Sequence, residues 1–231
     1  MATEAINRIH TEEDKAIANL SPAAVEAIER AALTTNYPTG VLLFSEGQSP
    51  RGVFIVRRGR IKLFVSGTDG RTLILRIAGP GDMLGVASVI SGREYEATAE
   101  TQQPCEVSFI RQSDLMRLMR FDGEIALSVT QHLSQDYTTT CREIRDLMLS
   151  DSAGEKLARL LVGWLDNNPE SKQTGQVKMT LTHEEIGQMI GTTRETVSRL
   201  LAGFKKQHMI QQRGATLVIS NRVALESLIT A

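Results

Sequence analysis

Residues 191–201, GTTRETVSRLL, place charged and hydroxyl side chains on one side of a predicted helix. The buried face of that helix is predicted from apolar residues at i, i+3, i+4 and i+7, which are Val197, Leu200, Leu201 and Phe204. The opposite face carries Glu195, Ser198 and Arg199, and Arg194 lies on its flank. Arginine binds guanine through two hydrogen bonds and glutamate accepts one from cytosine, so this face is suited to base edges in a DNA major groove.

A second group of side chains is suited to phosphates, which fix the register of a protein on DNA but carry no base information. Residues 193–213 hold five basic side chains and one acidic side chain, Glu195, although the whole chain has a formal net charge of −1. Positive charge is therefore expected to be concentrated in this segment. The predicted phosphate contacts are Arg194, Lys205, Lys206, Arg213, Thr182, Thr192 and Thr193.

The elements around this face predict how it is positioned. Thr182 followed by Glu185 three residues later is the pattern of a capping box at a helix start, and Gly191 then allows a tight turn into the second helix. Residues 209–212 and 215–219 are predicted as two strands joined at Arg213-Gly214. Residues 151–231 are thus expected to form a winged helix-turn-helix domain.

The segment from residue 41 to residue 110 has a different pattern. It breaks into the short apolar runs VLLF, VFIVR, RIKLFVS, TLILRIA and CEVSFI, separated by glycine-containing turns, which predicts an antiparallel sandwich or barrel. Before residue 36 we expect a helix with Ser21 as N-cap and an apolar stripe of Val25, Ile28 and Leu33. The fold class is therefore α+β, with an N-terminal β-barrel domain at residues 1–120.

Residues 121–149 contain no proline and one glycine, near the start, so they predict a single helix of about 40 Å. Its apolar positions are Val129, Leu133, Tyr137, Ile144 and Leu147, with Thr140 in the more polar middle. One interpretation is a helix that packs on its own β domain. The favoured interpretation is a parallel homodimer seam, because twofold pairing is the commonest way to bury a long narrow stripe. Residues 121–150 are assigned to this dimerisation helix and a hinge.

Composition excludes several other kinds of site. Two cysteines in 231 residues, Cys105 and Cys141, are too few for a disulfide scaffold or a four-thiolate iron-sulfur or zinc site. The histidines lie outside the predicted barrel strands at residues 41–110, so no metal site is expected within the barrel, and His132 is the one haem-ligand candidate. The chain shows no signal peptide and no apolar run of about 18 residues, which predicts a cytoplasmic protein that does not enter a membrane.

The segment EEIGQMIGTTRETVSRLLAGFKKQHMI resembles the DNA-binding helices of the cyclic-AMP receptor protein and fumarate-nitrate reduction regulator (Crp/Fnr) family. The strings LFSEGQSPRGVFIVRRGRIKLFV and GRTLILRIAGPGDMLG are similar to that family's effector barrel, and Asp151 falls at its hinge. The resemblance covers nearly the whole chain and implies a dimeric transcription regulator that binds palindromic double-stranded DNA and acts with RNA polymerase. By the same resemblance, Glu195, Ser198 and Arg199 match the E-x-x-S-R readers of the fumarate-nitrate branch, and Arg194 matches the cyclic-AMP branch.

The effector region departs from this family's pattern. Its cyclic-nucleotide binders carry Gly-Glu-Leu and then Arg-Ser/Thr-Ala, whereas this chain has Gly85-Val86-Ala87 and Tyr95-Glu96-Ala97. Valine cannot bond a ribose hydroxyl and tyrosine offers a phosphate no cation, so cyclic AMP is disfavoured and the effector stays unknown. Arg93 could reach inward only if its loop were remodelled. By the resemblance, Thr140 and Cys141 align where the dimer helix meets an effector, so a small molecule or thiol oxidation could act there.

The favoured function is a sequence-specific regulator whose β domain senses something other than cyclic AMP. The alternatives within the same class are a cyclic-nucleotide-responsive regulator with an atypical cassette and a regulator that is competent without an effector. The alternative from another class is an enzyme on a jelly-roll scaffold with a docking domain. Residues 41–110 contain no histidine and no recognisable catalytic set, so the enzyme is disfavoured.

Overall fold

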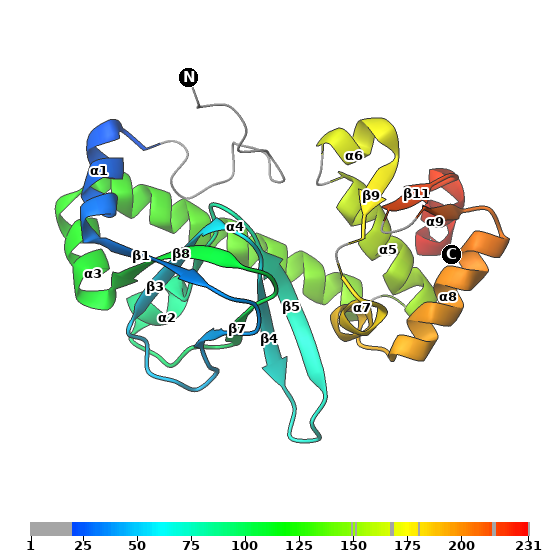
Figure 1. Ribbon diagram of the computed structural model, residues 1–231, viewed down its shortest axis with the longest axis horizontal. Coiled ribbons are helices and arrows are strands. Elements are labelled where there is room, and N and C mark those ends of the chain that lie inside the picture. Colours follow the sequence, from blue (N-terminus) through cyan, green and yellow to red (C-terminus); the bar gives the residue numbers. More distant parts are fainter. Residues whose placement is uncertain are drawn as a thin grey trace. The chain divides into compact units, whose positions relative to one another are not determined.

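The computed structural model describes residues 20–148, 150, 152–166, 169–179, 181–213 and 216–230. The chain divides into two compact units, residues 1–139 and 140–231, and each unit is described by itself (Figure 1). The boundary falls inside the long helix α4 (Gly123–Met148), so most of the expected dimerisation helix belongs to the first unit. The predicted hinge residue Asp151 lies outside the described residues.

The first unit is built on two four-stranded antiparallel sheets. One has the order β1-β8-β3-β6, with β1 (Ala32–Tyr37), β8 (Cys105–Arg111), β3 (Gly52–Arg58) and β6 (Met83–Leu84). The other has the order β2-β7-β4-β5, with β2 (Leu42–Phe44), β7 (Thr98–Thr101), β4 (Ile61–Ser66) and β5 (Thr72–Ala78). The antiparallel α+β prediction is confirmed, but within the described residues the sheets form a sandwich rather than the closed barrel that was expected.

Strand β3 separates the two cores of this unit. Val53 and Ile55 point to one side and pack in a cluster with helix residues such as Ile28 and Ile125. Phe54 and Val56 point to the other side, into the space between the sheets. Because successive side chains of a strand face opposite ways, a strand covered on both faces requires an unbroken apolar run, which explains the sequence VFIV.

The helices of the first unit lie against the β1-β8-β3-β6 sheet (Figure 1). They are α1 (Pro22–Ala31), α2 (Val86–Ser91), α3 (Gln112–Phe121) and α4. The expected single helix at residues 121–149 is corrected, because Phe121 ends α3 and α4 begins at Gly123. The Asp122 carboxylate accepts hydrogen bonds from the backbone N–H groups of Glu124 and Ile125, at 3.0 and 3.2 Å, and so caps the start of α4.

The N-terminal prediction is partly confirmed. Ser21 caps α1, where its hydroxyl accepts from the N–H of Ala24, and Ile28 is buried. Leu33 is not part of the helical stripe, because it lies in β1 and is 68% exposed. Strand β1 was not predicted, since its sequence ALTTNY lacks an alternating apolar pattern. It forms because β8 provides a complete antiparallel partner along its length.

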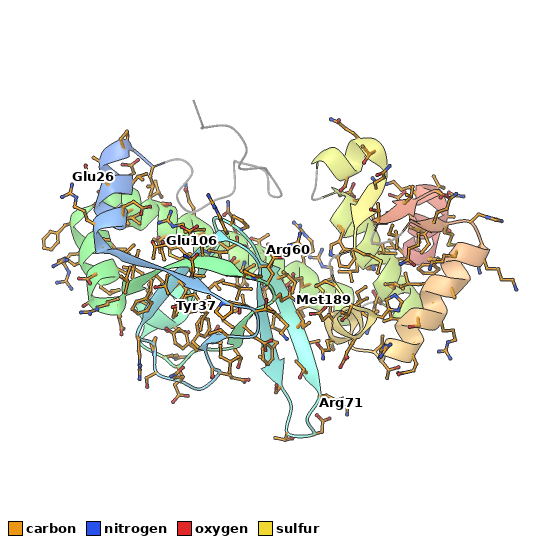
Figure 2. All side chains as sticks on the ribbon, viewed as in Figure 1. Glu26, Tyr37, Arg60, Arg71, Glu106 and Met189 are labelled. Carbon is orange, nitrogen blue, oxygen red and sulfur yellow. The ribbon has the colours of Figure 1, made fainter. Side chains whose placement is uncertain are left out.

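A long hairpin joins β4 and β5, and Arg71 lies at its tip (Figure 2). The Asp69 carboxylate accepts from the backbone N–H of Arg71 at 3.0 Å and from its side-chain Nε at 2.6 Å. These hydrogen bonds lower the pKa of the Asp69 carboxyl group, and the bond from the backbone N–H of Arg71 has the larger effect. Gly70 takes a φ of +79° in the turn, which a glycine adopts without strain.

The second unit is a helical domain with a small sheet of order β10-β11-β9. Its elements are α5 (Ala153–Asp166), α6 (Pro169–Thr174), β9 (Gln176–Lys178), α7 (His183–Ile190), α8 (Arg194–Lys206), β10 (Ile210–Arg213), β11 (Thr216–Ile219) and α9 (Arg222–Thr230). Helices α7 and α8 and the β10–β11 hairpin match the predicted winged helix-turn-helix. Helix α9 was not predicted from the sequence. The Arg222 guanidinium of α9 donates two hydrogen bonds, of 2.8 and 2.9 Å, to the Asp166 carboxylate of α5.

Candidate nucleic-acid interface

Both helices of the helix-turn-helix begin at well-formed caps. The Thr182 hydroxyl accepts from the N–H of Glu185, and the Glu185 carboxylate accepts from the N–H of Thr182, which is the predicted capping box. The Thr193 hydroxyl accepts from the N–H of Thr196 at the start of α8. Gly191 has a φ of +68° in the turn between the helices, a conformation that favours glycine. The local sequence therefore determines where both helices start and where the first one ends.

Gly187 controls how closely the two helices approach. A Cβ atom at this position would lie 2.7 Å from the backbone oxygen of Thr192, so any larger side chain would push the turn away. The close approach allows the N–H of Thr192 to donate to the Gly187 carbonyl at 2.8 Å. On the same side, Val197 and Leu201 of α8 are buried, as predicted. The outward face of α8 is thus held in one orientation by packing behind it.

That outward face carries three exposed side chains, Arg194, Glu195 and Arg199. None of the three makes a hydrogen bond or an ion pair with another part of the chain that the structure describes. Glu195 and Arg199 are four residues apart and therefore share one side of the helix. A charged side chain that is exposed and uncommitted can form the two-point contacts by which bases are recognised.

Ser198, the fourth predicted reader, differs from the other three. It is only partly exposed, and its Oγ lies 2.8 Å from Nδ1 of His183, the first residue of α7. The sequence pattern gave His183 no part in the outward face of α8. The signal that could have identified it is its position next to the cap residue Thr182, because that end of α7 turns toward α8.

The predicted phosphate contacts fall into three groups. Lys206 is exposed, whereas the Lys205 ammonium donates a hydrogen bond to the Gln212 side chain in β10 and so links α8 to the wing. The hydroxyls of Thr182 and Thr193 are engaged in the caps, and Thr192 is partly exposed in the turn. The side chain of Arg213 and the turn at residues 214–215 lie outside the described residues.

The first unit places the predicted effector residues in different surroundings. Tyr95 is 3% exposed and lies between the two sheets, where its ring stacks on Phe44 with the ring centroids 4.1 Å apart. Its hydroxyl donates to the Gly52 carbonyl at 2.6 Å and accepts from the N–H of Arg51 at 3.3 Å. The phenol is therefore both buried and hydrogen-bonded within its own chain.

Among the other effector candidates, Gly85 lies directly against the Tyr95 ring. A Cβ atom at Gly85 would lie 2.6 Å from the Tyr95 ring, so the glycine makes room for the tyrosine. Val86 is buried in the cluster on the helix side of β3, away from the core that holds Tyr95. Ala87, Arg93, Glu96, Thr140 and Cys141 are exposed.

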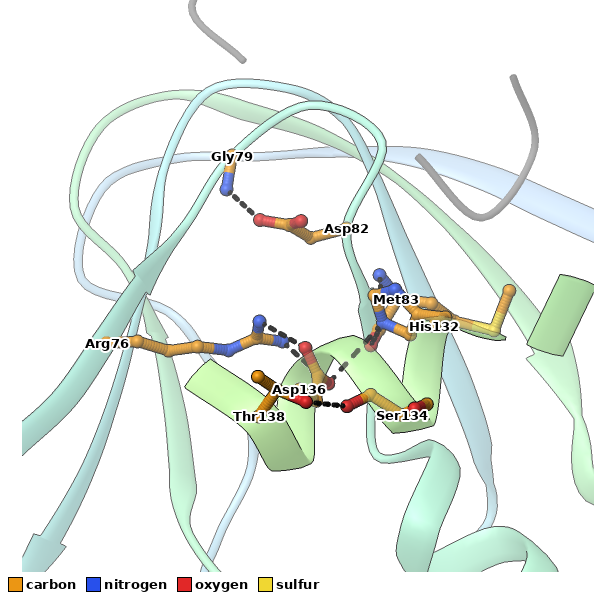
Figure 3. A network of polar contacts seen from close by, with 8 residues as sticks. All are labelled: Arg76, Gly79, Asp82, Met83, His132, Ser134, Asp136 and Thr138. Atoms are coloured by element: carbon orange, nitrogen blue, oxygen red, sulfur yellow. Dashed lines mark hydrogen bonds and ion pairs between the residues drawn. The ribbon is translucent and has the colours of Figure 1, made fainter. Parts of the chain in front are cut away.

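A polar network connects the β sandwich to α4 (Figure 3). The Arg76 guanidinium in β5 donates to both carboxylate oxygens of Asp136, at 2.7 and 3.3 Å. Nε2 of His132 lies 3.5 Å from the same carboxylate and 2.9 Å from the Met83 carbonyl. His132 is 3% exposed and faces its own β domain. Its assignment as a haem-ligand candidate is therefore corrected: it is a bonded core histidine.

Two residues of the predicted dimer seam lie on the face of α4 that packs against its own β domain. Val129 is 2% exposed and packs in the core of its own chain, and Leu133 packs against that core. The assignment of Val129 to a dimer interface is corrected for this reason, whereas that of Leu133, which is partly exposed, stays a prediction. Tyr137 and Ile144 are 73% and 55% exposed, and the Leu147 side chain lies outside the described residues. The helix thus has one apolar face that its own domain covers and a second that it does not.

The two cysteines also have opposite surroundings. Cys105 is buried and its thiol donates to the carbonyl oxygens of Arg60 and Gln103, at 3.2 and 3.1 Å. Burial raises the pKa of the Cys105 thiol. Cys141 is exposed on α4. Within the described residues no group of three or more His, Cys, Asp or Glu side chains could hold a metal ion, and no helix could cross a membrane.

Two family models match the chain. A cyclic nucleotide-binding domain matches residues 34–122, and a Crp-like helix-turn-helix domain matches residues 155–228. The cAMP-activated global transcriptional regulator CRP of Pasteurella multocida is 28% identical over 185 residues, which are 79% of this chain and 88% of that protein.

Solved structures share the fold. FixK2 from Bradyrhizobium japonicum has a TM-score of 0.74 and 23% identity, and the match covers 87% of this chain and 98% of FixK2. The c-di-GMP responsive global regulator CLP from Xanthomonas campestris has a TM-score of 0.72 and 21% identity, with coverage of 86% and 99%. The two family models together match more than half of the chain, and they match it in the order in which the two units occur. The chain belongs to the Crp/Fnr family of DNA-binding transcriptional regulators.

Proposed function

We propose that the chain acts as a homodimer that places one α8 helix from each protomer in the major groove of palindromic DNA. The observation that carries this proposal is the pair Glu195 and Arg199, exposed and without partners on a helix whose opposite side is fixed by packing. Two exposed charged groups that make no ion pair in the described chain add little to the stability of the fold, and they are available to bind a ligand. The ligand that suits a planar guanidinium beside a carboxylate is a run of base edges.

The second apolar face of α4 supports the dimer. Leu127, Tyr137, Ile144 and Met148 are all more than half exposed. Together with Ser134 and Cys141 they follow the spacing of a coiled-coil seam, with one seven-residue step from Leu127 to Ser134 and then steps of three and four. We call these six residues the exposed α4 stripe. A second copy of the same stripe is the partner we propose, because a twofold axis lets one surface cover itself.

The dimer determines the form of the DNA site. Two α8 helices related by a twofold axis meet two half-sites about one helical turn apart. We propose a TTGA-like or TGTGA-like half-site in which Arg199 binds the guanine of the GA step and Glu195 accepts from a cytosine amino group. Arg194, Lys206 and Arg213 are proposed to neutralise phosphates at the edges of this contact.

We propose that the β sandwich responds to a signal other than cyclic AMP. The relative from Pasteurella multocida is named as cAMP-activated, and the structural neighbour CLP is named as responsive to c-di-GMP, so the shared fold does not select one effector. In this chain, Tyr95 fills the space beside Gly85 and Val86 points into the other core. Neither residue supplies a charge to a ribose or a phosphate.

Two alternatives remain within the same class, and calorimetry separates them. A cyclic-nucleotide regulator with an atypical cassette needs Arg93 to turn inward from its exposed loop, and a submicromolar dissociation constant for cyclic AMP would favour it. A regulator that is competent without any effector would bind its DNA site at full affinity as purified. Binding that requires a cell extract would favour a different signal.

RNA polymerase is the second partner we propose, in the cytoplasm, where a bacterial-type regulator meets its promoters. This follows from membership of a family of transcription regulators and from the proposed DNA contact. Co-migration of polymerase with the regulator–DNA complex in a gel-shift titration would test it. A complex with an unchanged mobility would contradict it.

The experiment that tests the proposed function replaces Arg199 by alanine and measures affinity for a selected half-site and for random DNA. We expect a loss of about 1 to 3 kcal/mol on the selected site, which is roughly 5- to 150-fold, and little change on random DNA. Lys206→Ala is the matched control, since it should weaken all sequences alike and lower the salt slope by about one. Lys205 is a poorer control because it also holds Gln212 of the wing. An unchanged ratio of selected to random affinity in Arg199→Ala would exclude α8 as the reading helix.

A further inference from the structure

Ser198 is the one predicted base reader that the chain itself already holds. Its Oγ lies 2.8 Å from Nδ1 of His183, while Glu195 and Arg199 on the same side of α8 have no partner in the described chain. A contact between the first residue of one helix and the middle of the next joins the two elements of the helix-turn-helix on their outward side. Ser198 therefore differs from Glu195 and Arg199 in that a residue of α7 already fixes its hydroxyl group.

Both ends of this hydrogen bond are fixed by packing. The capping box of Thr182 and Glu185 determines where α7 starts, and so where His183 leaves the backbone. Ile186 of α7 and Val197 of α8 are fully buried, immediately behind the pair. The backbones approach closely at Gly187, where an added Cβ atom would come within 2.7 Å of Thr192, and the N–H of Thr192 donates to the Gly187 carbonyl at 2.8 Å, which ties the turn to α7. The pair is therefore preorganised before any DNA is bound.

The chemistry of the pair limits what Ser198 can offer to a base. A serine hydroxyl has one proton to donate and two lone pairs, and the hydrogen bond to His183 uses one of these. If Nδ1 carries a proton, it donates to Ser198 and the serine proton is left for an acceptor such as guanine O6 or thymine O4. If Nδ1 is unprotonated, it accepts the serine proton and the serine can only accept, as from an adenine or cytosine amino group.

We propose that His183 is a positioning residue for base recognition, which holds the Ser198 hydroxyl in one rotamer so that the two residues act as a single unit. The unit selects one base pair in each half-site, beside the pair bound by Arg199. The inference rests on the proposed function, because it requires α8 to lie in the major groove. If His183 instead bound a phosphate, it would change the affinity for all DNA sequences equally.

The test measures the affinity ratio between the selected half-site and half-sites changed at each single position. Five variants of the full-length protein are compared: Ser198→Ala, His183→Ala, the double variant, His183→Asn and His183→Gln. Asparagine places a polar atom where Nδ1 lies, whereas glutamine places its amide further out, near the position of Nε2. Thermal unfolding of each variant shows whether it is folded. The Arg199→Ala variant is measured alongside them as the test of the proposed function.

We expect Ser198→Ala and His183→Ala each to lower the ratio at the same position by about two- to tenfold, the range of one net hydrogen bond. The double variant should lose no more than the larger single loss, His183→Asn should recover most of the ratio, and His183→Gln should not. Losses that add in the double variant would overturn the proposal. Equal weakening of all sequences by His183→Ala, with a smaller salt slope, would overturn it in favour of a phosphate contact. If Arg199→Ala also left the ratio unchanged, the proposed function itself would fail, whereas additive losses with a normal Arg199 effect would remove this inference alone.

Discussion

At the predicted effector region, the first unit bonds the Tyr95 hydroxyl within its own chain, whereas the second unit leaves Glu195 and Arg199 uncommitted on the outward face of α8. Tyr95 is buried, stacked on Phe44 and hydrogen-bonded to the Gly52 carbonyl. Glu195 and Arg199 are exposed and have no partner in the described chain. A satisfied buried phenol stabilises a fold, and an unpaired charge does not, so the comparison separates residues that hold this chain together from residues available for binding.

The largest expected effect is that of removing Tyr95. Tyr95→Ala should lower the free energy of unfolding by about 3 to 5 kcal/mol, because the ring leaves a cavity between the sheets. Tyr95→Phe keeps the ring and should cost about 1 kcal/mol, the value of the hydroxyl hydrogen bonds. Urea denaturation measures both, and Arg199→Ala should stay within about 0.5 kcal/mol of the wild type in the same assay. A Tyr95→Ala protein as stable as the wild type would mean that the residue belongs to an open binding site.

The two faces of α4 extend the same comparison to one helix. Ile125 is 1% exposed in the core of its own domain, so Ile125→Ala should cost about 2 to 5 kcal/mol of stability. Ile144 is 55% exposed on the exposed α4 stripe, so Ile144→Asp should separate the dimer and leave the protomer folded. Sedimentation and circular dichroism distinguish the outcomes. An Ile144→Asp protein that sediments as an unchanged dimer would remove the stripe as the interface.

Two glycines give a smaller contrast inside the DNA-binding unit. Gly187→Ala should destabilise by about 1 to 3 kcal/mol, since its Cβ would be 2.7 Å from the Thr192 oxygen. Gly203 lies in α8 with nothing within 4 Å of an added Cβ, so Gly203→Ala should stabilise by roughly 0.5 to 1 kcal/mol. Thermal unfolding measures both changes. If the two variants shifted the melting temperature in the same direction, the close approach at Gly187 would not be the constraint inferred here.

The smallest expected effect concerns the thiols. Because burial raises the pKa of Cys105, its thiol stays protonated in the folded chain at a pH where the unfolded chain has begun to lose that proton. The contribution of Cys105 to stability is therefore complete below a pH of about 8.5 and falls as the pH rises beyond it. Cys105→Ala should remove that alkaline slope in urea titrations at several pH values.

A thiol reagent provides the matching control. The Ile144→Asp variant is used because Cys141 lies on the exposed α4 stripe and would be covered in the proposed dimer. In this folded variant the exposed Cys141 should react with the reagent, whereas the buried Cys105 should react only after unfolding. Rapid labelling of both thiols in the folded protein would contradict the placement of Cys105.

Local patterns were enough to predict the helix-turn-helix. Ser21 and Thr182 cap the helices that they were expected to cap, and the wing strands lie within one or two residues of the predicted ranges. Caps and glycine turns act over three or four residues, so they can be identified without knowledge of the fold. Strand β1 could not be identified in this way, because the residues of β8 that pair with it are 68 to 78 residues away in the chain.

The faces of α4 show the limit of a periodic pattern. The sequence contains two apolar stripes at helical spacing, and the predicted dimer seam combined Val129 from one with Tyr137 and Ile144 from the other. Only the position of the β sandwich shows that Val129 is covered by its own chain. A period shows that a face is apolar, but it does not show what covers that face.

The sequence by itself determined the class of protein, the order of its domains and the chemistry of its reading helix, because helix caps, turn glycines and the alternation of apolar residues are local signals. Only the tertiary structure decided which of the candidate site residues have side chains available to bind a partner. It buried Tyr95 between two sheets, bonded His132 to its own domain and brought His183 to Ser198. The physical reason is that the availability of a polar group depends on its neighbours in space, and these come from residues distant in the chain.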